Sequence, residues 1–170
     1  MTESNEYRDR LVDHLEDLAQ REDRATLALL RGTLQEGRAL EGLPVVLPFV
    51  NPYGRSPDRA EDDALLLAAL FAIHPESGSL FLPAALRAVA QTSDSVELRF
   101  RALLSASRQD LPVHLRHAVG LVASHGMPID YRDLHTAIRF WDQPSERTRR
   151  QWARAFWTPD NSGETRERSA

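Results

Sequence analysis

Apolar residues recur at helical intervals from the beginning of the chain. Near the N-terminus they stand three or four positions apart, at Tyr7, Leu11, Leu15 and Leu18. This spacing places them on one face of a helix. A second apolar stripe of Leu27, Leu30 and Leu34 follows Asp23, whose side chain can cap the first turn. No stretch shows the sustained two-residue alternation of a half-buried strand, so we expect helices throughout.

A proline-rich connector separates these helices from the most apolar part of the chain. Residues 43–58 contain four prolines and Gly54, which predicts a loop with one short turn around Val45–Val50. The acidic segment 58–63 then precedes Ala64–Ile73, a run that is apolar nearly all round. Acids favour a helix N-terminus because they meet the positive end of the helix dipole. We therefore predict a buried central helix that ends near His74.

Five further helices are predicted in the second half of the chain. They cover Leu80–Ala90, Ser95–Ser107, Val113–His125, Tyr131–Trp141 and Arg147–Trp157. Asp94, Asp110 and Asp130 stand where N-caps are expected, and Gly126 follows one helix end. The predicted fold class is therefore all-α, a compact bundle of seven to eight helices with no sheet.

The length of 170 residues suits a single domain. We expect residues 1–158 to form it, with an N-terminal half of residues 1–92 and a C-terminal helical bundle of residues 93–158. The polar segment 159–170 is expected to be disordered. No apolar run approaches the ~20 residues of a membrane span, and the polar start MTESNEYRDR lacks the apolar core of a signal peptide. These features predict a cytoplasmic protein that does not enter a membrane.

The usual catalytic signatures are missing from the sequence. The absence of cysteine excludes thiolate catalysis, disulfides and cysteine-based zinc sites, and no phosphate-binding glycine loop or HExxH motif occurs. His114 and His117 can share a helix face, but no third metal ligand stands at a familiar spacing, which favours a surface or groove-lining pair. We therefore expect no enzyme activity, no cofactor and no metal site. The alternative is a metal-dependent nuclease that uses Asp62 or Asp63, although adjacent acids at a helix start are more typical of caps.

The N-terminal part of the chain is acidic, and the part that follows it is basic. The net charge is −4, yet residues 1–63 hold 14 acids and 8 arginines, whereas residues 64–157 hold 8 acids and 11 arginines. All 21 basic residues are arginine, which a GC-rich genome explains more readily than function does. In either case the chain is rich in planar side chains that can donate several hydrogen bonds to a phosphate.

Many of these arginines are spaced seven residues apart. The sets are Arg24, Arg31 and Arg38; Arg101 and Arg108; Arg132 and Arg139; and Arg147 and Arg154. Two residues at this spacing in one helix differ by only ~20° around the axis and lie ~10 Å apart along it. Each set would form a basic stripe that suits a phosphate backbone. A solvated face opposite a leucine stripe produces the same spacing, so the spacing alone leaves both interpretations open.

Aromatic residues cluster near the end of the helical part of the chain. They are Phe140, Trp141, Trp152, Phe156 and Trp157. Such residues can stack on nucleic-acid bases. The helical spacing of Trp152 and Phe156 favours a core role instead, in which they join the last two helices.

Several short motifs occur in a characteristic order along the chain. In the C-terminal half they are LRFRALL, Arg108, Leu115-Arg116, the turn Ile129-Asp130-Tyr131 and the closing WARAF. In the N-terminal half they are DRATLALLRG and the Leu47–Val50 connector. Over about residues 20–157 this order resembles the CasB family, the small subunits of the type I-E CRISPR complex Cascade.

The resemblance implies an all-α subunit without catalytic activity. It implies a pair of copies in the assembly, in contact with the large subunit at one end and with the repeated backbone subunits along their length. The basic surface would support the hybrid of guide RNA and target DNA and hold the displaced, non-target DNA strand of the R-loop. Base pairing reads the sequence in such complexes, so backbone contacts from the protein suffice.

The nucleic-acid-binding residues that the resemblance implies are all arginines. By position they are Arg31, Arg99, Arg108, Arg116, Arg147 and Arg149, and helical spacing adds Arg24 and Arg101. The acidic N-terminal half departs from a basic binding surface, so we expect weak, salt-sensitive binding by the isolated subunit. The alternative hypothesis is a helical adaptor that bridges protein subunits, with its arginines paired to acidic partners.

Overall fold

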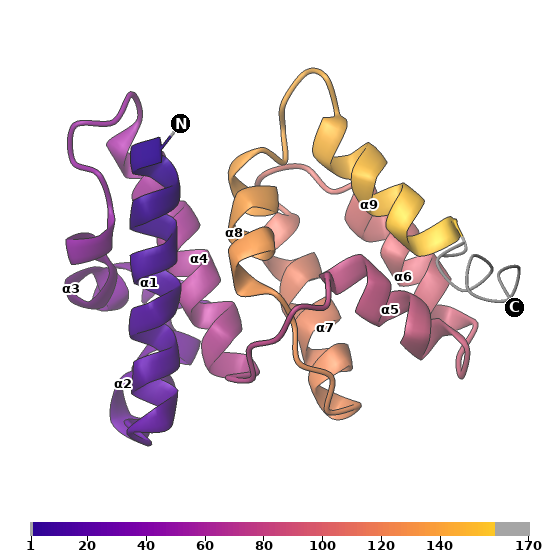
Figure 1. Ribbon diagram of the computed structural model, residues 1–170, viewed down its shortest axis with the longest axis horizontal. Helices are drawn as coiled ribbons and strands as arrows, with labels where there is room; N and C mark the ends of the chain where they lie inside the picture. The colour runs from indigo at the N-terminus through magenta and orange to yellow at the C-terminus, as the bar shows by residue number, and fades with distance from the viewer. Residues whose placement is uncertain (1, 159–170) are drawn as a thin grey trace, which may run out of the picture.

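The computed structural model describes residues 2–158, and their regular structure is helical. The α-helices are α1 (Thr2–Gln20), α2 (Arg24–Gly32), α3 (Leu43–Val46), α4 (Pro57–Ile73), α5 (Leu82–Ala90), α6 (Ser95–Leu104), α7 (Leu111–Ser124), α8 (Tyr131–Arg139) and α9 (Arg147–Trp157). Figure 1 shows their arrangement. No strand forms within residues 2–158, which confirms the all-α prediction. The tail predicted to be disordered, 159–170, lies outside the described residues.

The helix that exceeds the expected seven to eight lies in the proline-rich connector. There α3 is flanked by two short 3₁₀ helices, Ala39–Gly42 and Leu47–Phe49. Pro44 and Pro48 are the second residues of α3 and of the second 3₁₀ helix. Proline is tolerated there because the first N–H groups of a helix have no partner within it. The connector therefore contains more helix than its proline content predicted.

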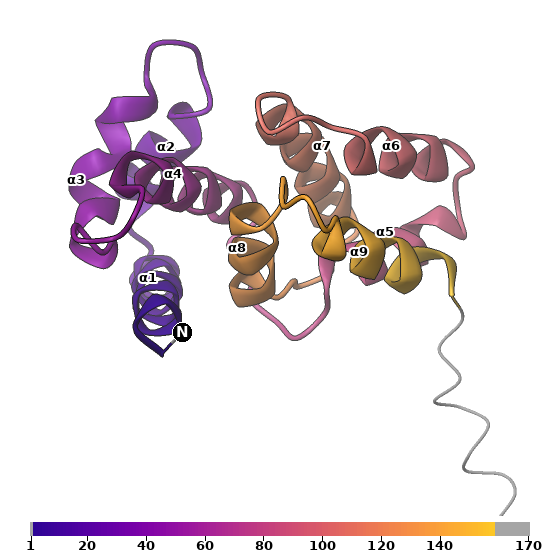
Figure 2. The same cartoon turned by 90° about the horizontal axis from the view of Figure 1, so that it is seen from above.

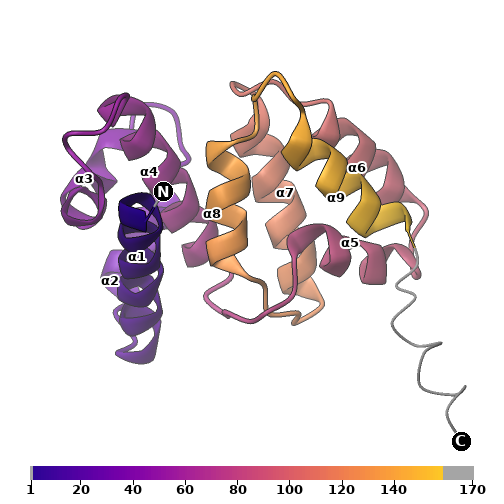
Figure 3. The ribbon, with the colours of Figure 1, turned by 45° about the horizontal axis from the view of Figure 1, so that its top comes forward.

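Helix α4 is the centre of the molecule, as the apolar run predicted. Its residues from Asp63 to Ala72 are all buried. It packs against α1, α2 and α3 on one side and against α7 and α8 on the other, as Figure 3 shows. Helix α7 also belongs to a second group of helices, α5, α6, α7 and α9, which pack on one another. No helix within residues 2–158 is both long and apolar enough to cross a bilayer.

Aromatic pairs fix α9 to this second group of helices. The rings of Trp141 and Trp152 meet edge to face with centroids 5.2 Å apart, and Phe100 stacks on Phe156 at 4.1 Å. Trp152 and Phe156 are both buried. The predicted core role of these two residues is therefore confirmed.

Helix ends differ from the predicted ones at two places that concern the arginines. Helix α2 ends at Gly32 and α6 ends at Leu104, so Arg38 and Arg108 do not continue the helices of Arg31 and Arg101, as a stripe at seven-residue spacing requires. The predicted stripes are wrong at these two positions. The predicted N-caps form at two helix starts. Asp23 and Asp130 accept bonds from backbone N–H groups of α2 and α8, whereas the side chains of Asp94 and Asp110 cap nothing.

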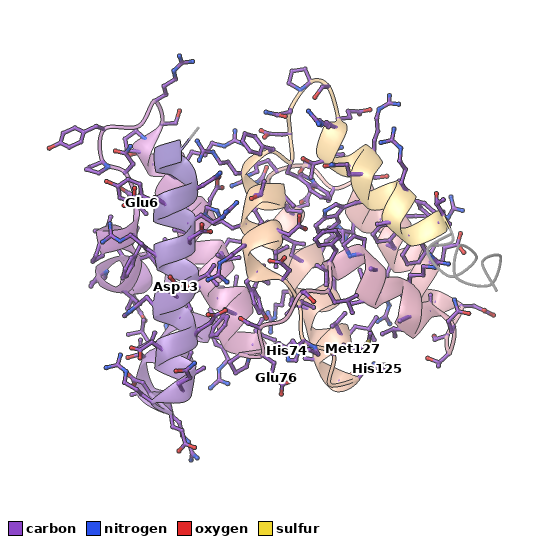
Figure 4. The ribbon with its side chains drawn as sticks, viewed as in Figure 1. Glu6, Asp13, His74, Glu76, His125 and Met127 are labelled. Carbon is purple, nitrogen blue, oxygen red and sulfur yellow. The ribbon has the colours of Figure 1, made fainter. Side chains whose placement is uncertain are left out.

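A buried junction holds the end of α4 against the loop between α7 and α8. Nε2 of His74 donates to the carbonyl oxygen of Met127 at 2.7 Å, and these residues lie side by side in Figure 4. The Tyr131 hydroxyl donates to the carbonyl oxygen of His74. An isolated β-bridge between Ser77 and Ile129 closes the junction. These contacts fix α7 relative to α4, and so relative to α2.

Candidate nucleic-acid interface

A groove with an apolar floor and a cationic rim runs between α5, α6 and α7. Its cavity measures about 730 Å³. The floor includes Ile73, Leu86, Val96, Phe100 and Leu103. The cations of the rim are Arg99 and Arg116, and His114 and His117 lie beside them. The two histidines therefore line a groove, as their spacing predicted.

A smaller hollow of about 280 Å³ continues this groove onto α2. It is lined by Arg31 and Arg38, and it shares Ile73 and Arg116 with the larger cavity. Together the two hollows form what we name the α2–α6–α7 groove. Figure 2 shows α2, α7 and α6 along one long side of the molecule, with α1, α8 and α9 on the other.

The structure brings three of the predicted arginines together in this groove. Arg31, Arg99 and Arg116 come from three helices, their side chains are exposed, and they form no ion pair with any described residue. Cations held near one another without anions favour a polyanionic ligand, because a phosphate backbone relieves their repulsion. Arg38, which the seven-residue spacing grouped with Arg31 but which was not among the predicted binding residues, lies at the edge of this set, and its guanidinium pairs with Glu41 at 2.8 Å.

Three other predicted arginines are exposed but lie outside the groove. Arg101 pairs with Glu97 at 2.7 Å, and its guanidinium carbon stands 5.0 Å from the centre of the Trp157 ring. Arg24 is 4.0 Å from Glu22. Arg147 begins α9 and makes no ion pair within the described residues. These residues are available to a ligand, but the fold does not gather them into one site.

Arg108 is turned into the protein. It forms an ion pair with the buried carboxylate of Asp63 in α4 and donates to the carbonyl oxygen of Ile138 in α8. Burial lowers its pKa below the ordinary arginine value, and repulsion by Arg59 lowers that pKa further. Asp63, which sequence reasoning assigned to a helix cap, is instead the buried partner of this arginine. The pair joins α4 to the segment between α6 and α7.

Arg149 is also held by protein groups. It donates to the carbonyl oxygens of Trp141 and Ala106, both at 3.1 Å, and its guanidinium carbon lies 5.3 Å from the centre of the Trp141 ring. The indole N–H of Trp141 donates to the same oxygen of Ala106. Arg149 therefore links α9 to the loops that follow α6 and α8.

The acidic residues considered for a metal site do not converge. Among the residues whose side chains are described, no group of three or more histidine or acidic side chains is placed to hold a metal ion. Asp63 is engaged by Arg108, whereas its neighbour Asp62 is exposed.

Comparison with known proteins decides the family. The profile described as CRISPR-associated protein Cse2 matches residues 9–157. The chain belongs to the Cse2 family. A Cse2 protein from Thermus thermophilus is 32% identical over 130 residues, which cover 74% of this chain and 75% of that protein.

Solved Cse2-family structures share the fold. The crystal structure of CasB from Thermus thermophilus matches with a TM-score of 0.77 and 30% identity, covering 89% of this chain and 98% of that one, which confirms the resemblance to CasB. A chain of a structure named CRISPR RNA-guided surveillance complex matches with a TM-score of 0.69 and 21% identity, covering 90% of this chain and 92% of that one. At that identity the match shows the fold alone.

Proposed function

We propose that this chain is the non-catalytic small subunit of a type I-E CRISPR surveillance complex and stabilises the R-loop by holding nucleic-acid backbone. The observation that carries the proposal is the convergence of Arg31, Arg99 and Arg116 in the α2–α6–α7 groove. Membership of the Cse2 family and the fold shared with a chain of a surveillance complex support the proposal that the chain is a subunit of such a complex. Guide RNA, target DNA and displaced DNA are the proposed ligands. The large subunit, the repeated backbone subunits and a second copy of the chain are the proposed protein partners.

Contacts to the backbone are sufficient for this role. In an RNA-guided complex the guide reads the target by base pairing, so a supporting subunit needs charge and shape but no readout of bases. Guanidinium groups suit the task because their planar donors match phosphate oxygens. The proposed subunit therefore acts on the lifetime of the R-loop and not on the choice of target.

The test is the salt dependence of R-loop dissociation from the assembled complex. We expect the triple variant Arg31→Ala, Arg99→Ala and Arg116→Ala to shorten the R-loop lifetime on any target sequence. Each lost phosphate contact should also reduce the slope of log affinity against log salt by about 0.9 for duplex DNA. Unchanged lifetime and unchanged slope would contradict the proposal.

A matched control separates local contacts from overall charge. The triple variant Arg21→Ala, Arg150→Ala and Arg154→Ala removes the same charge from exposed positions that line none of the three cavities described for this chain. We expect it to leave the R-loop lifetime within about twofold of the unmodified complex, because surface charges beyond a Debye length are screened.

The apolar floor of the groove supports a second candidate function, a helical adaptor that binds another protein. Leu86, Phe100 and Leu103 lie at the bottom of the groove, where side chains of a partner helix can pack. In this role the arginines would pair with acids of the partner. The adaptor predicts that the groove variants weaken assembly of the complex even when nucleic acid is absent.

A further inference from the structure

A second cationic cleft shares no lining residue with the α2–α6–α7 groove. Its cavity of about 630 Å³ is bounded by α1, the loop before α4, the first turns of α4 and the end of α8. These elements meet near the N-terminal end of α1, in the upper part of Figure 1. The volume lies within the range of sites that enclose a small ligand.

Arginines outnumber acids around this cleft. Four arginines line it, Arg8, Arg55, Arg59 and Arg139, against two aspartates, Asp63 and Asp142. Both aspartates already have cationic partners, Asp63 in Arg108 and Asp142 in Arg59. Arg8 pairs with Asp9 at 2.7 Å. Within the described residues Arg55 and Arg139 form no ion pair, so two exposed guanidinium groups remain for an anion.

Aromatic rings line the same cleft. They are Tyr7, Phe49 and Phe140. Phe140 keeps 37% of its surface exposed, and the guanidinium carbon of Arg139 lies 5.5 Å from its ring centre. An exposed aromatic ring beside an unpaired arginine is the combination with which proteins hold unpaired nucleotides, because the ring stacks on the base while the cation meets the phosphate.

A neutral histidine also lines the cleft. Burial lowers the pKa of His135 to about 4, and the cations Arg139 and Arg8 lower it further. The imidazole is therefore neutral at neutral pH, with one ring nitrogen able to donate and the other able to accept. Such a group suits the edge of a base better than a second phosphate.

We infer that this cleft binds a nucleotide of single-stranded nucleic acid, with its phosphates on Arg55 and Arg139 and its base against Phe140. A duplex does not fit this role, because its bases are stacked on one another and cannot lie on the ring. An acidic protein segment would use the arginines but would leave the aromatic ring without a planar partner. This inference rests on the proposed function in one respect, the identity of the single strand. In an R-loop that strand is the displaced DNA.

Binding of a labelled single-stranded oligonucleotide to the purified full chain tests the inference. An oligothymidine of 15 nucleotides can be followed by fluorescence anisotropy at low salt. We expect Arg55→Ala with Arg139→Ala to weaken binding about tenfold and to reduce the salt slope by about 1.4, since each contact to a single strand contributes about 0.7. The control Arg21→Ala with Arg150→Ala removes equal charge elsewhere and should change affinity by less than twofold.

Stacking has its own readout. With 2-aminopurine in the oligonucleotide, we expect fluorescence quenching on binding that Phe140→Leu removes and Phe140→Tyr retains, while circular dichroism shows that both variants remain folded. Competition by a duplex of the same sequence should be weak.

Several results would overturn the inference. They are an unchanged affinity and salt slope in the double variant, equal competition by an oligoglutamate of matched charge, and absence of any binding at low salt. None of these results bears on the groove variants in the R-loop assay, so the two proposals fail separately.

Discussion

Arg116 and Arg149 carry the same charge but occupy different environments. The guanidinium of Arg116 is exposed at the rim of a groove, without an anionic partner among the described residues. The guanidinium of Arg149 satisfies two backbone carbonyl oxygens and covers an indole ring. Desolvated hydrogen bonds to a charged group stabilise a fold, whereas an exposed charge contributes little to it. The two residues should therefore respond differently to the same substitution.

We predict that Arg149→Ala lowers the free energy of unfolding by about 1–3 kcal/mol, because two carbonyl oxygens lose their charged donor. Its neighbour Arg150 is exposed and pairs only with Glu146 at 3.8 Å. Arg150→Ala should change stability by less than about 0.5 kcal/mol. Urea denaturation of both variants is the measurement. Equal stability, together with a weaker R-loop in the Arg149 variant, would favour a phosphate contact for Arg149 instead.

At the scale of the elements, periodicity was sufficient to predict the long helices. The apolar run 64–73 predicted the buried centre of α4, and Asp23 and Asp130 predicted the starts of α2 and α8. Periodicity could not predict α3, because proline at the first turn of a helix looks the same in sequence as proline in a loop. Nor could it predict the inward turn of Arg108, since spacing fixes an angle about one axis and says nothing of which helix packs there.

The sequence predicted the arginines of the candidate site but not how they come together. Arg31, Arg99 and Arg116 belong to different helices, and only the packing of α2, α6 and α7 brings them together. The second cleft could not be foreseen, because Arg55 and Arg139 are distant in sequence and share no motif.

Helix α8 carries two groups, Asp133 and His135, whose titrations have opposite effects on the stability of the fold. Burial is the main cause that raises the pKa of Asp133 to about 6, so its contribution to stability is present at low pH and is lost as the pH rises through about 6. Burial lowers the pKa of His135 to about 4, so its contribution is present above pH 6.5 and is lost as the pH falls toward 4. Between these limits the two contributions partly cancel.

We predict that Asp133→Asn makes the chain more sensitive to acid. Without the carboxyl, the unfavourable protonation of His135 is no longer offset, so the free energy of unfolding should fall more steeply than in the unmodified chain between pH about 6.5 and about 4. His135→Gln should have the opposite effect on the slope. Chemical denaturation across this pH range measures both, and parallel stability curves for the three proteins would contradict the prediction.

At the scale of the whole molecule, unpaired arginines gather at two separate surfaces. The α2–α6–α7 groove and the cleft beside α8 share no lining residue. Figure 2 shows α2, α6 and α7 along one long side of the molecule and α1 and α8 along the other. Elsewhere the acids of α1 are partly used within the protein, for example Asp13 and Glu16 with Arg132 of α8. The net charge of −4 therefore does not describe either surface. A nucleic acid would meet local positive charge on an overall acidic chain, which makes binding dependent on assembly and on salt.

Ultraviolet crosslinking of the assembled complex on target DNA tests the central proposal most directly. After digestion, mass spectrometry identifies which peptides of this subunit carry nucleotides. We predict adducts on the peptides of α2, α6 and α7 that surround Arg31, Arg99 and Arg116, and their loss in the triple alanine variant with the complex still assembled. A subunit that assembles normally yet carries no nucleotide adduct on these peptides would contradict it.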